Sequence, residues 1–180
     1  MKVLVKGGKK FQKELLEQFT LWAGYKLLGS RLADNCSITV QLKKCKKKDE
    51  ILGSCIGTDE LLLPRDFLII LEKEQTPKLL IQTLAHEMTH VKQFALGELK
   101  YPKRNLALTK WLGETIRDGD IDYWDMPWEI EAHGREVGLY MQFIEYMGIL
   151  SQFKSDSPDY TLTPKIKLKE RLLPNGLDKK

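Results

Sequence analysis

The stretch TLAHEMTHVKQ, residues 83–93, places two of the chain's three histidines four residues apart, with a glutamate directly after the first. Upstream, Thr76 is followed by a proline, which is the pattern of a helix N-cap with proline at the first helical position. Downstream, Gly97 is a residue type that commonly ends helices. A helix is therefore predicted between these two residues. Side chains four residues apart in a helix lie about 40° apart around the axis, so His86 and His90 project side by side.

The faces of this predicted helix differ in composition. An apolar stripe, expected to pack inward, consists of Leu80, Leu84, Met88, Val91 and Ala95. The two histidines lie off that stripe, on a face that they share with Leu79, Thr83 and Gln93. Histidines that belonged to the core would be expected on the stripe itself. The pair is therefore predicted to line a cleft.

Two histidines in a cleft suit a zinc ion, because zinc accepts imidazole ligands and, in catalytic sites, keeps one position open for water. Glu87 lies about 100° on from His86, so its carboxylate can reach that water without being a ligand. A catalytic zinc shell usually has three protein ligands. The motif supplies only two, since Leu96 stands where the third histidine of an extended H-E-x-x-H-x-x-G-x-x-H motif would fall.

The third ligand is expected on a second helix, which begins near PWEIEAHGREVGLY, residues 127–140, and continues to about residue 147. Glu129 and Glu131 point in different directions there, since they lie about 200° apart around the axis. Glu129 shares its face with His133, Val137, Tyr140 and Ile144, whereas Glu131 shares a more solvated face with Arg135, Gly138 and Gln142. Glu129 is the predicted third ligand, and Glu131 and His133 are alternatives to it.

The pattern His86-Glu87-x-x-His90, followed some forty residues later by Glu129-x-x-Ala132, resembles the gluzincin class of zinc metallopeptidases. The wording HEMTHVKQ…PWEIEA is similar to small metallopeptidase-like proteins of phages and bacteria. The resemblance covers about residues 66–147. It implies a zinc ion held by the two histidines and Glu129, with Glu87 as the general base of peptide hydrolysis.

The resemblance also implies a zincin-like α+β fold, in which a mixed sheet packs against the active-site helix and a second helix carries the third ligand. An edge strand of that sheet would pair with the bound peptide, and residues 53–60 or 66–74 would supply it. The chain departs from the family at His133, where an aspartate usually orients a ligand histidine. That role is expected to fall to Asp118, Asp120 or Asp122.

Hydrophobic patterning outside the motif helices predicts the remaining elements. Strands are expected at residues 1–7 and 36–44, within 51–64, and at 66–74, the last as a continuous apolar run buried on both faces. A helix is expected over 9–28 and a short helical piece around 109–116. One domain is predicted over residues 1–154, followed by a loosely ordered basic tail over 155–180.

The amino-acid composition limits where the protein can be located and what it can bind. The net charge of +4 is mild, and much of the excess lies in KKCKKK, residues 43–48, where a solvated loop is a better explanation than a nucleic-acid site. Cys36, Cys45 and Cys55 form no C-x-x-C pair, which argues against a disulfide framework. No stretch approaches the roughly 18 apolar residues of a membrane-spanning helix. A cytoplasmic protein with free thiols is expected.

These observations favour a zinc metallopeptidase that acts on a peptide or protein substrate. Such a small peptidase is expected either to act on one partner protein or to be restrained by an inhibitor or regulator that the sequence does not reveal. Tyr123, His133 and Tyr140 are the candidates for stabilising an oxyanion. One alternative is a deformylase-like amidase that uses the upstream Cys55 as a ligand. The other alternative is a non-catalytic binding or regulatory protein on a peptidase scaffold. Retention of Glu87, which is needed only for chemistry, favours catalysis.

Overall fold

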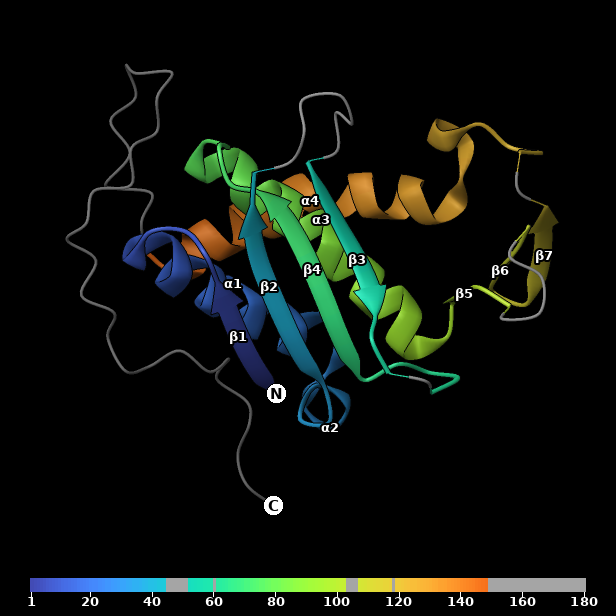
Figure 1. Ribbon diagram of the computed structural model, residues 1–180, viewed down its shortest axis with the longest axis horizontal. Coiled ribbons are helices and arrows are strands. Elements are labelled where there is room, and N and C mark those ends of the chain that lie inside the picture. Colours follow the sequence, from blue (N-terminus) through green and yellow to red (C-terminus); the bar gives the residue numbers. More distant parts are fainter. Residues whose placement is uncertain (45–51, 60, 103–106, 118, 149–180) are drawn as a thin grey trace.

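The computed structural model describes residues 1–44, 52–59, 61–102, 107–117 and 119–148. Within them the chain forms a mixed α+β fold around a four-stranded sheet with the strand order β1-β2-β4-β3 (Figure 1). The strands are β1 (Lys2–Lys6), β2 (Ser37–Lys43), β3 (Gly53–Gly57) and β4 (Asp66–Glu72). Strands β1, β2 and β4 run parallel, and β3 pairs antiparallel with β4 at one edge. Of the two candidates for an edge strand, β3 is therefore at the edge and β4 is central.

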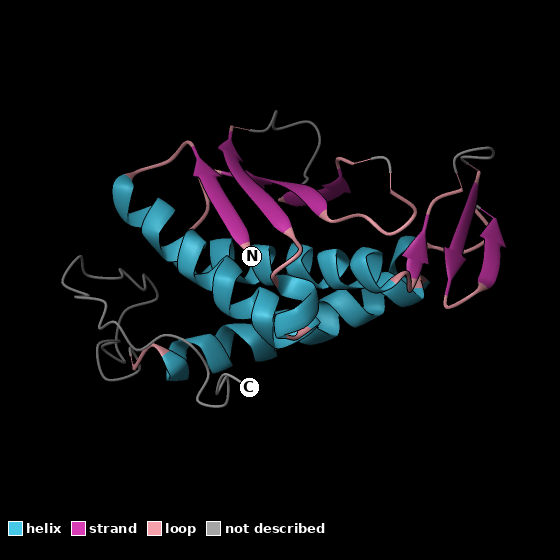
Figure 2. Ribbon diagram, turned by 90° about the horizontal axis from the view of Figure 1, so that it is seen from below, coloured by secondary structure: helices cyan, strands magenta, loops and turns pink. Residues whose placement is uncertain are grey.

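The described helices lie on one face of this sheet, and none of them covers the other face (Figure 2). They are α1 (Lys10–Leu28), α2 (Ser30–Ala33), α3 (Pro77–Leu96) and α4 (Pro127–Tyr146), with a short 3-10 turn η1 (Tyr123–Asp125) before α4. The expected strands and the three long helices are confirmed, with ends shifted by a few residues. The prediction that 66–74 is buried on both faces is wrong, because Ile69 faces the helices whereas Leu68 and Ile70 face the uncovered side and are only half-buried.

A second, three-stranded antiparallel sheet lies at one end of the molecule (Figure 1, Figure 2). It consists of β5 (Leu99–Lys100), β6 (Leu108–Trp111) and β7 (Glu114–Arg117). The short helical piece predicted around 109–116 is therefore wrong. Leu112 and Gly113 both have positive φ, 48° and 95°, and form a two-residue turn of the kind that joins antiparallel strands. Leucine rarely adopts a positive φ, and such turns usually have Asn-Gly. Because this turn has Leu-Gly instead, the sequence does not indicate a hairpin here.

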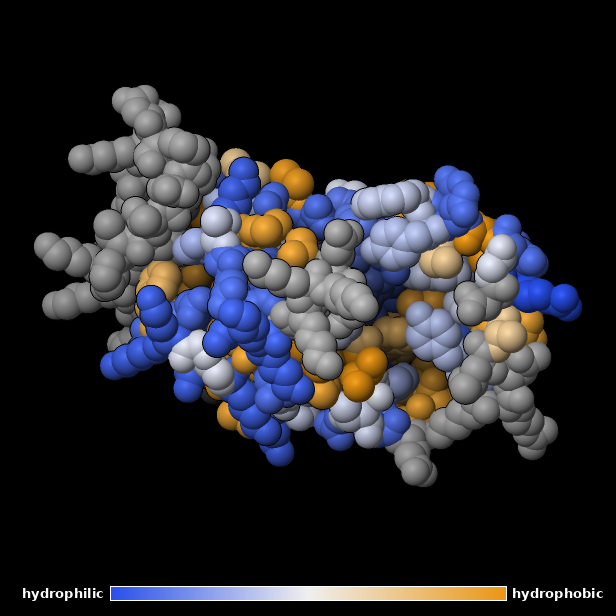
Figure 3. Space-filling view, turned by 45° about the horizontal axis from the view of Figure 1, so that its top comes forward, coloured by the Kyte–Doolittle hydropathy of each residue, from blue (hydrophilic) through white to orange (hydrophobic). Residues whose placement is uncertain are grey.

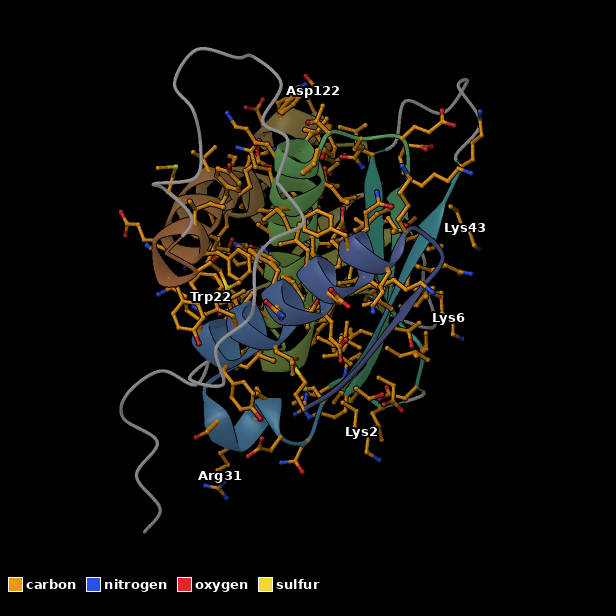
Figure 4. All side chains as sticks on the ribbon, turned by 90° about the vertical axis from the view of Figure 1, so that its left-hand side faces the viewer. Lys2, Lys6, Trp22, Arg31, Lys43 and Asp122 are labelled. Atoms are coloured by element: carbon orange, nitrogen blue, oxygen red, sulfur yellow. The ribbon has the colours of Figure 1, made fainter. Side chains whose placement is uncertain are left out.

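An aromatic cluster joins α1 to α4 on the side of the helices away from the sheet. Phe19 and Trp22 contact Phe143, with ring centroids 5.0 and 5.5 Å apart. Trp22 lies between these two helices, whereas Lys2, Lys6 and Lys43 project from the side of the sheet (Figure 4). The cluster packs the second half of α4 against α1.

Several expectations fall outside the described residues. These are the basic tail over 155–180, most of the lysine run, Cys45 and Asp118. The single-domain boundary at 154 stays a prediction. Among the described helices, none combines the length and apolar content that crossing a bilayer requires.

Candidate metal centre

Helix α3 forms as the sequence predicts. The hydroxyl of Thr76 accepts a hydrogen bond from the backbone N–H of Leu79, and Gly97 ends the helix with a left-handed φ of 74°. The predicted apolar stripe is buried throughout. His86 and His90 are 8% and 9% exposed and line a cavity of about 580 Å³. The prediction that the pair lines a cleft is confirmed.

Three side chains converge in this cleft. The Nε2 atoms of His86 and His90 lie 3.1 Å apart. One carboxylate oxygen of Glu129, Oε2, lies 3.2 Å from Nε2 of His86, and the other, Oε1, lies 3.5 Å from Nε2 of His90. Ligands about 2.0–2.1 Å from a tetrahedral zinc ion are separated by about 3.3–3.4 Å, which matches these spacings. The three residues form a group that could hold a metal ion.

The two glutamates at the start of α4 have different surroundings. Glu129 is buried, and although burial alone would raise its pKa, its contacts with the His86 and His90 rings lower that pKa well below its ordinary value. Glu131 faces the other way and contacts Lys92 at 2.7 Å and Arg135 at 2.8 Å. Of the two carboxylates, only Glu129 therefore belongs to the potential metal group.

Asp120 and Asp122, the two expected orienting aspartates that the structure describes, do not contact the histidines. Asp120 and Asp122 are exposed, and Asp122 projects at one end of the molecule (Figure 4). Instead, a carboxylate oxygen of Glu136 lies 3.4 Å from the Nδ1 atom of His86, the nitrogen opposite the metal group. The same oxygen lies 3.3 Å from Nδ1 of His133. Glu136 is seven residues after Glu129, so it lies about two turns further along the same helix face. This spacing could have identified Glu136 from the sequence, but Glu136 is not among the site residues predicted above.

His133 is not part of the group formed with Glu129, but it belongs to a second cluster of potential ligands with His86 and Glu136. The buried Nδ1 of His86 makes no hydrogen bond within the described residues. The Glu136 carboxylate is therefore near this nitrogen, but its angle does not suit a hydrogen bond. If Nε2 binds a metal ion, Nδ1 carries the proton and this carboxylate is the acceptor within reach. Glu136 is therefore expected to orient the first histidine.

Replacing Glu136 with glutamine is expected to weaken zinc binding by about 10–100-fold, the usual effect of removing an acceptor behind a ligand histidine. Competition with a chromophoric chelator measures the affinity. Asp122→Asn is the matched control and should bind zinc as the wild type does, because Asp122 is exposed. If zinc affinity fell equally in both variants, Glu136 would act only through its negative charge and not through contact with His86.

Glu87 lies directly beside the metal group and is 4% exposed. Burial raises the pKa of Glu87 to about 7, against the opposing effect of His90 and His86. The close approach of β3 encloses this carboxylate. A Cβ atom at Gly53 would lie 2.6 Å from the Glu87 carboxylate and 2.7 Å from Thr83, so a larger residue there would have to displace these side chains.

The rest of the cleft combines aromatic and apolar side chains with the charged group. Phe94, Leu99 and Tyr101 line it beyond His90, whereas Trp124 and His133 line it beside His86. A hollow with both hydrophilic and hydrophobic residues in its floor is visible right of centre in the space-filling view (Figure 3).

Tyr123 projects from η1 into the cleft. Its hydroxyl donates a hydrogen bond to Glu129 at 2.9 Å and lies 3.4 Å from Nε2 of His133. Burial and the neighbouring carboxylate raise the pKa of Tyr123, so the hydroxyl stays protonated and able to donate. Of the three candidates for oxyanion stabilisation, Tyr123 and His133 line the cleft, whereas Tyr140 is buried and is not among the residues that line it.

Cys55 on β3 also lines the cleft, but among the described residues it belongs to neither group of potential metal ligands. Burial raises the pKa of its thiol well above the ordinary value, and Glu87 adds to this effect. Cys36 and Cys55 are both free thiols. These observations do not support Cys55 as a ligand of the deformylase kind.

The fold and the site together define a mixed α+β protein with a buried His/His/Glu group that could hold a metal ion. No protein-family model matches the chain, and no curated protein or solved structure matches it either.

Proposed function

We propose that this chain is a zinc-dependent metallopeptidase of the gluzincin kind, with a zincin-like fold. The observation that carries the proposal is the position of Glu87. Its carboxylate is buried in the same cleft as His86, His90 and Glu129 but is not one of the converging group. A protein that binds metal only for structure has no need of such a carboxylate.

In this mechanism His86, His90 and Glu129 would hold the zinc ion. When bound, zinc lowers the pKa of water towards neutrality and polarises the carbonyl of the scissile peptide bond. Glu87 accepts the proton of the attacking water and then passes it to the leaving amine. The Tyr123 hydroxyl and His133 are close enough to the group to donate hydrogen bonds to the oxyanion that develops.

Within the described residues, the edge of β3 that faces away from β4 pairs with no other strand and suits an extended peptide. Leu52 and Thr58 make backbone hydrogen bonds with β4, and antiparallel pairing alternates along a strand. The backbone N–H and C=O groups of Gly53 and Cys55 therefore point away from β4, and both residues line the cleft. A substrate strand added at this edge would pass the metal group, with Phe94 and Leu99 available to an apolar side chain.

The test is hydrolysis of casein and of a mixed peptide library by the zinc-loaded protein, with chelator-treated protein as the blank. Cleavage that requires zinc supports the proposal. Full zinc occupancy without any turnover would favour a non-catalytic binding or regulatory protein on a peptidase scaffold.

Gly53→Ala is expected to lower peptide turnover by about 10–100-fold without loss of zinc, because the added methyl group displaces the Glu87 carboxylate and small misplacements of catalytic groups are costly. Turnover and zinc content are measured on the same preparation. Gly134→Ala is the control, since nothing lies within 4 Å of a Cβ atom there and alanine favours the helix. Undiminished turnover in Gly53→Ala would mean that Glu87 is not held by this contact.

A further inference from the structure

We propose that Gln93 is a positioning residue that fixes His90 in the tautomer with its proton on Nδ1, and that couples this histidine to the helix carrying Glu129. The inference rests on the metal group of the proposed function but not on peptide hydrolysis. Gln93 is fully buried, so water does not compete for its amide group. It lies on α3, three residues after His90, and reaches across to α4.

The orientation of the Gln93 amide follows from its neighbours on α4. Its nitrogen lies 2.9 Å from the backbone carbonyl of Trp128 and 3.1 Å from a carboxylate oxygen of Glu131. A carbonyl and an ionised carboxylate only accept hydrogen bonds. The end of the amide that faces them must therefore be the NH₂ group, because the oxygen would be repelled by both.

The orientation of the amide then decides the tautomer of His90. With the nitrogen committed to α4, the amide oxygen faces Nδ1 of His90 at 2.8 Å. An amide oxygen only accepts, so this short contact is a hydrogen bond only when Nδ1 carries the proton. In neutral His90 the lone pair is then on Nε2, the atom that faces His86 and Glu129.

The same side chain connects two members of the metal group. Trp128, whose carbonyl accepts from Gln93, directly precedes Glu129 in α4. Glu131 is held in turn by Lys92 and Arg135, so its carboxylate is a fixed acceptor. Gln93 therefore links the ring orientation of His90 to the position of the first turn of α4. Glu131, an alternative ligand in the sequence analysis, acts here as a support for Gln93.

The tautomer can be measured without metal or substrate. In metal-free protein labelled with 15N-histidine, at an alkaline pH at which His90 is neutral, two-bond 1H–15N correlation spectra distinguish a proton on Nδ1 from one on Nε2. For His90, assigned by its loss in His90→Ala, we expect the Nδ1–H pattern. An Nε2–H pattern in the wild type would overturn the proposal, whatever the protein hydrolyses.

Gln93→Met keeps the length and burial of the side chain but removes the amide. We expect His90 to lose its single tautomer and zinc affinity to fall by about 10–100-fold. The same exchange at the exposed Gln142 of α4 is the matched control and should change neither quantity. Retention of both the Nδ1–H pattern and wild-type zinc affinity in Gln93→Met would overturn the proposal. If Gln93→Met does not fold, Gln93→Asn, whose shorter amide cannot span both partners, replaces it with the same expected outcomes.

The two proposals fail in different ways. Absence of Glu87-dependent peptide hydrolysis would contradict the proposed function and leave the His90 spectrum unchanged. A peptidase whose His90 is protonated on Nε2 in the metal-free protein would retain the proposed function and contradict the role of Gln93.

Discussion

Glu87→Gln is expected to lose nearly all peptide hydrolysis while keeping its zinc and its fold. Glutamine has nearly the same shape, and Glu87 is not part of the His86, His90 and Glu129 group. The metal group should therefore stay intact. What disappears is the acceptor of the water's proton, and general-base catalysis typically contributes about 10²–10⁴-fold. The loss should reach the upper end of that range, because in the proposed mechanism the same carboxylate also protonates the leaving amine.

The measurement compares zinc content by elemental analysis with peptide turnover in the wild type and in Glu87→Gln. Glu14→Gln, on the exposed side of α1, controls for removal of a negative charge. Loss of zinc from Glu87→Gln would make Glu87 a ligand and contradict its assignment as a base. Full activity with full zinc would rule out the peptidase mechanism proposed above.

Glu129→Ala and His86→Ala are expected to lose zinc and hydrolysis together. Each change removes one of the three converging side chains, and the two that remain would hold zinc only weakly. The wild type should also gain thermal stability when zinc is added, by about 2.7 kcal/mol at a free zinc concentration of 100 times Kd. The two variants should show little or no such gain.

Glu145→Gln, at an exposed position of the same helix, is the control for Glu129→Ala and should retain about one zinc per chain. Glu131→Gln removes the other candidate ligand together with the support for Gln93, and it should still bind zinc, with a lower affinity. Elemental analysis after extensive dialysis and melting curves with and without zinc give the two readouts. Zinc retained by Glu129→Ala but lost from Glu131→Gln would show that the ligand assignment on α4 is wrong.

Prediction from local sequence patterns was correct where all the determining residues lie within one helix. The Thr76-Pro77 start, the Gly97 end and the apolar stripe of α3 are properties of neighbouring residues in one helix, and the structure has them as predicted. Local rules failed around 109–116, where Leu112 adopts a positive φ that its side chain does not favour. Pairing with β5 and packing of Trp111 against Trp128 stabilise the hairpin there, and neither contact can be read from the local pattern.

The metal group shows most clearly which features the sequence predicts and which depend on the tertiary structure. The sequence by itself determined that His86 and His90 share a helix face with Glu87 beside them, because spacing along a helix is a local geometric relation. It also favoured Glu129 over Glu131, since helical periodicity separates their faces. Only the tertiary structure decided which side chains surround that group. Gly53, Gln93 and Glu136 act across the contacts of α3 with β3 and α4, and such contacts depend on the packing of whole elements.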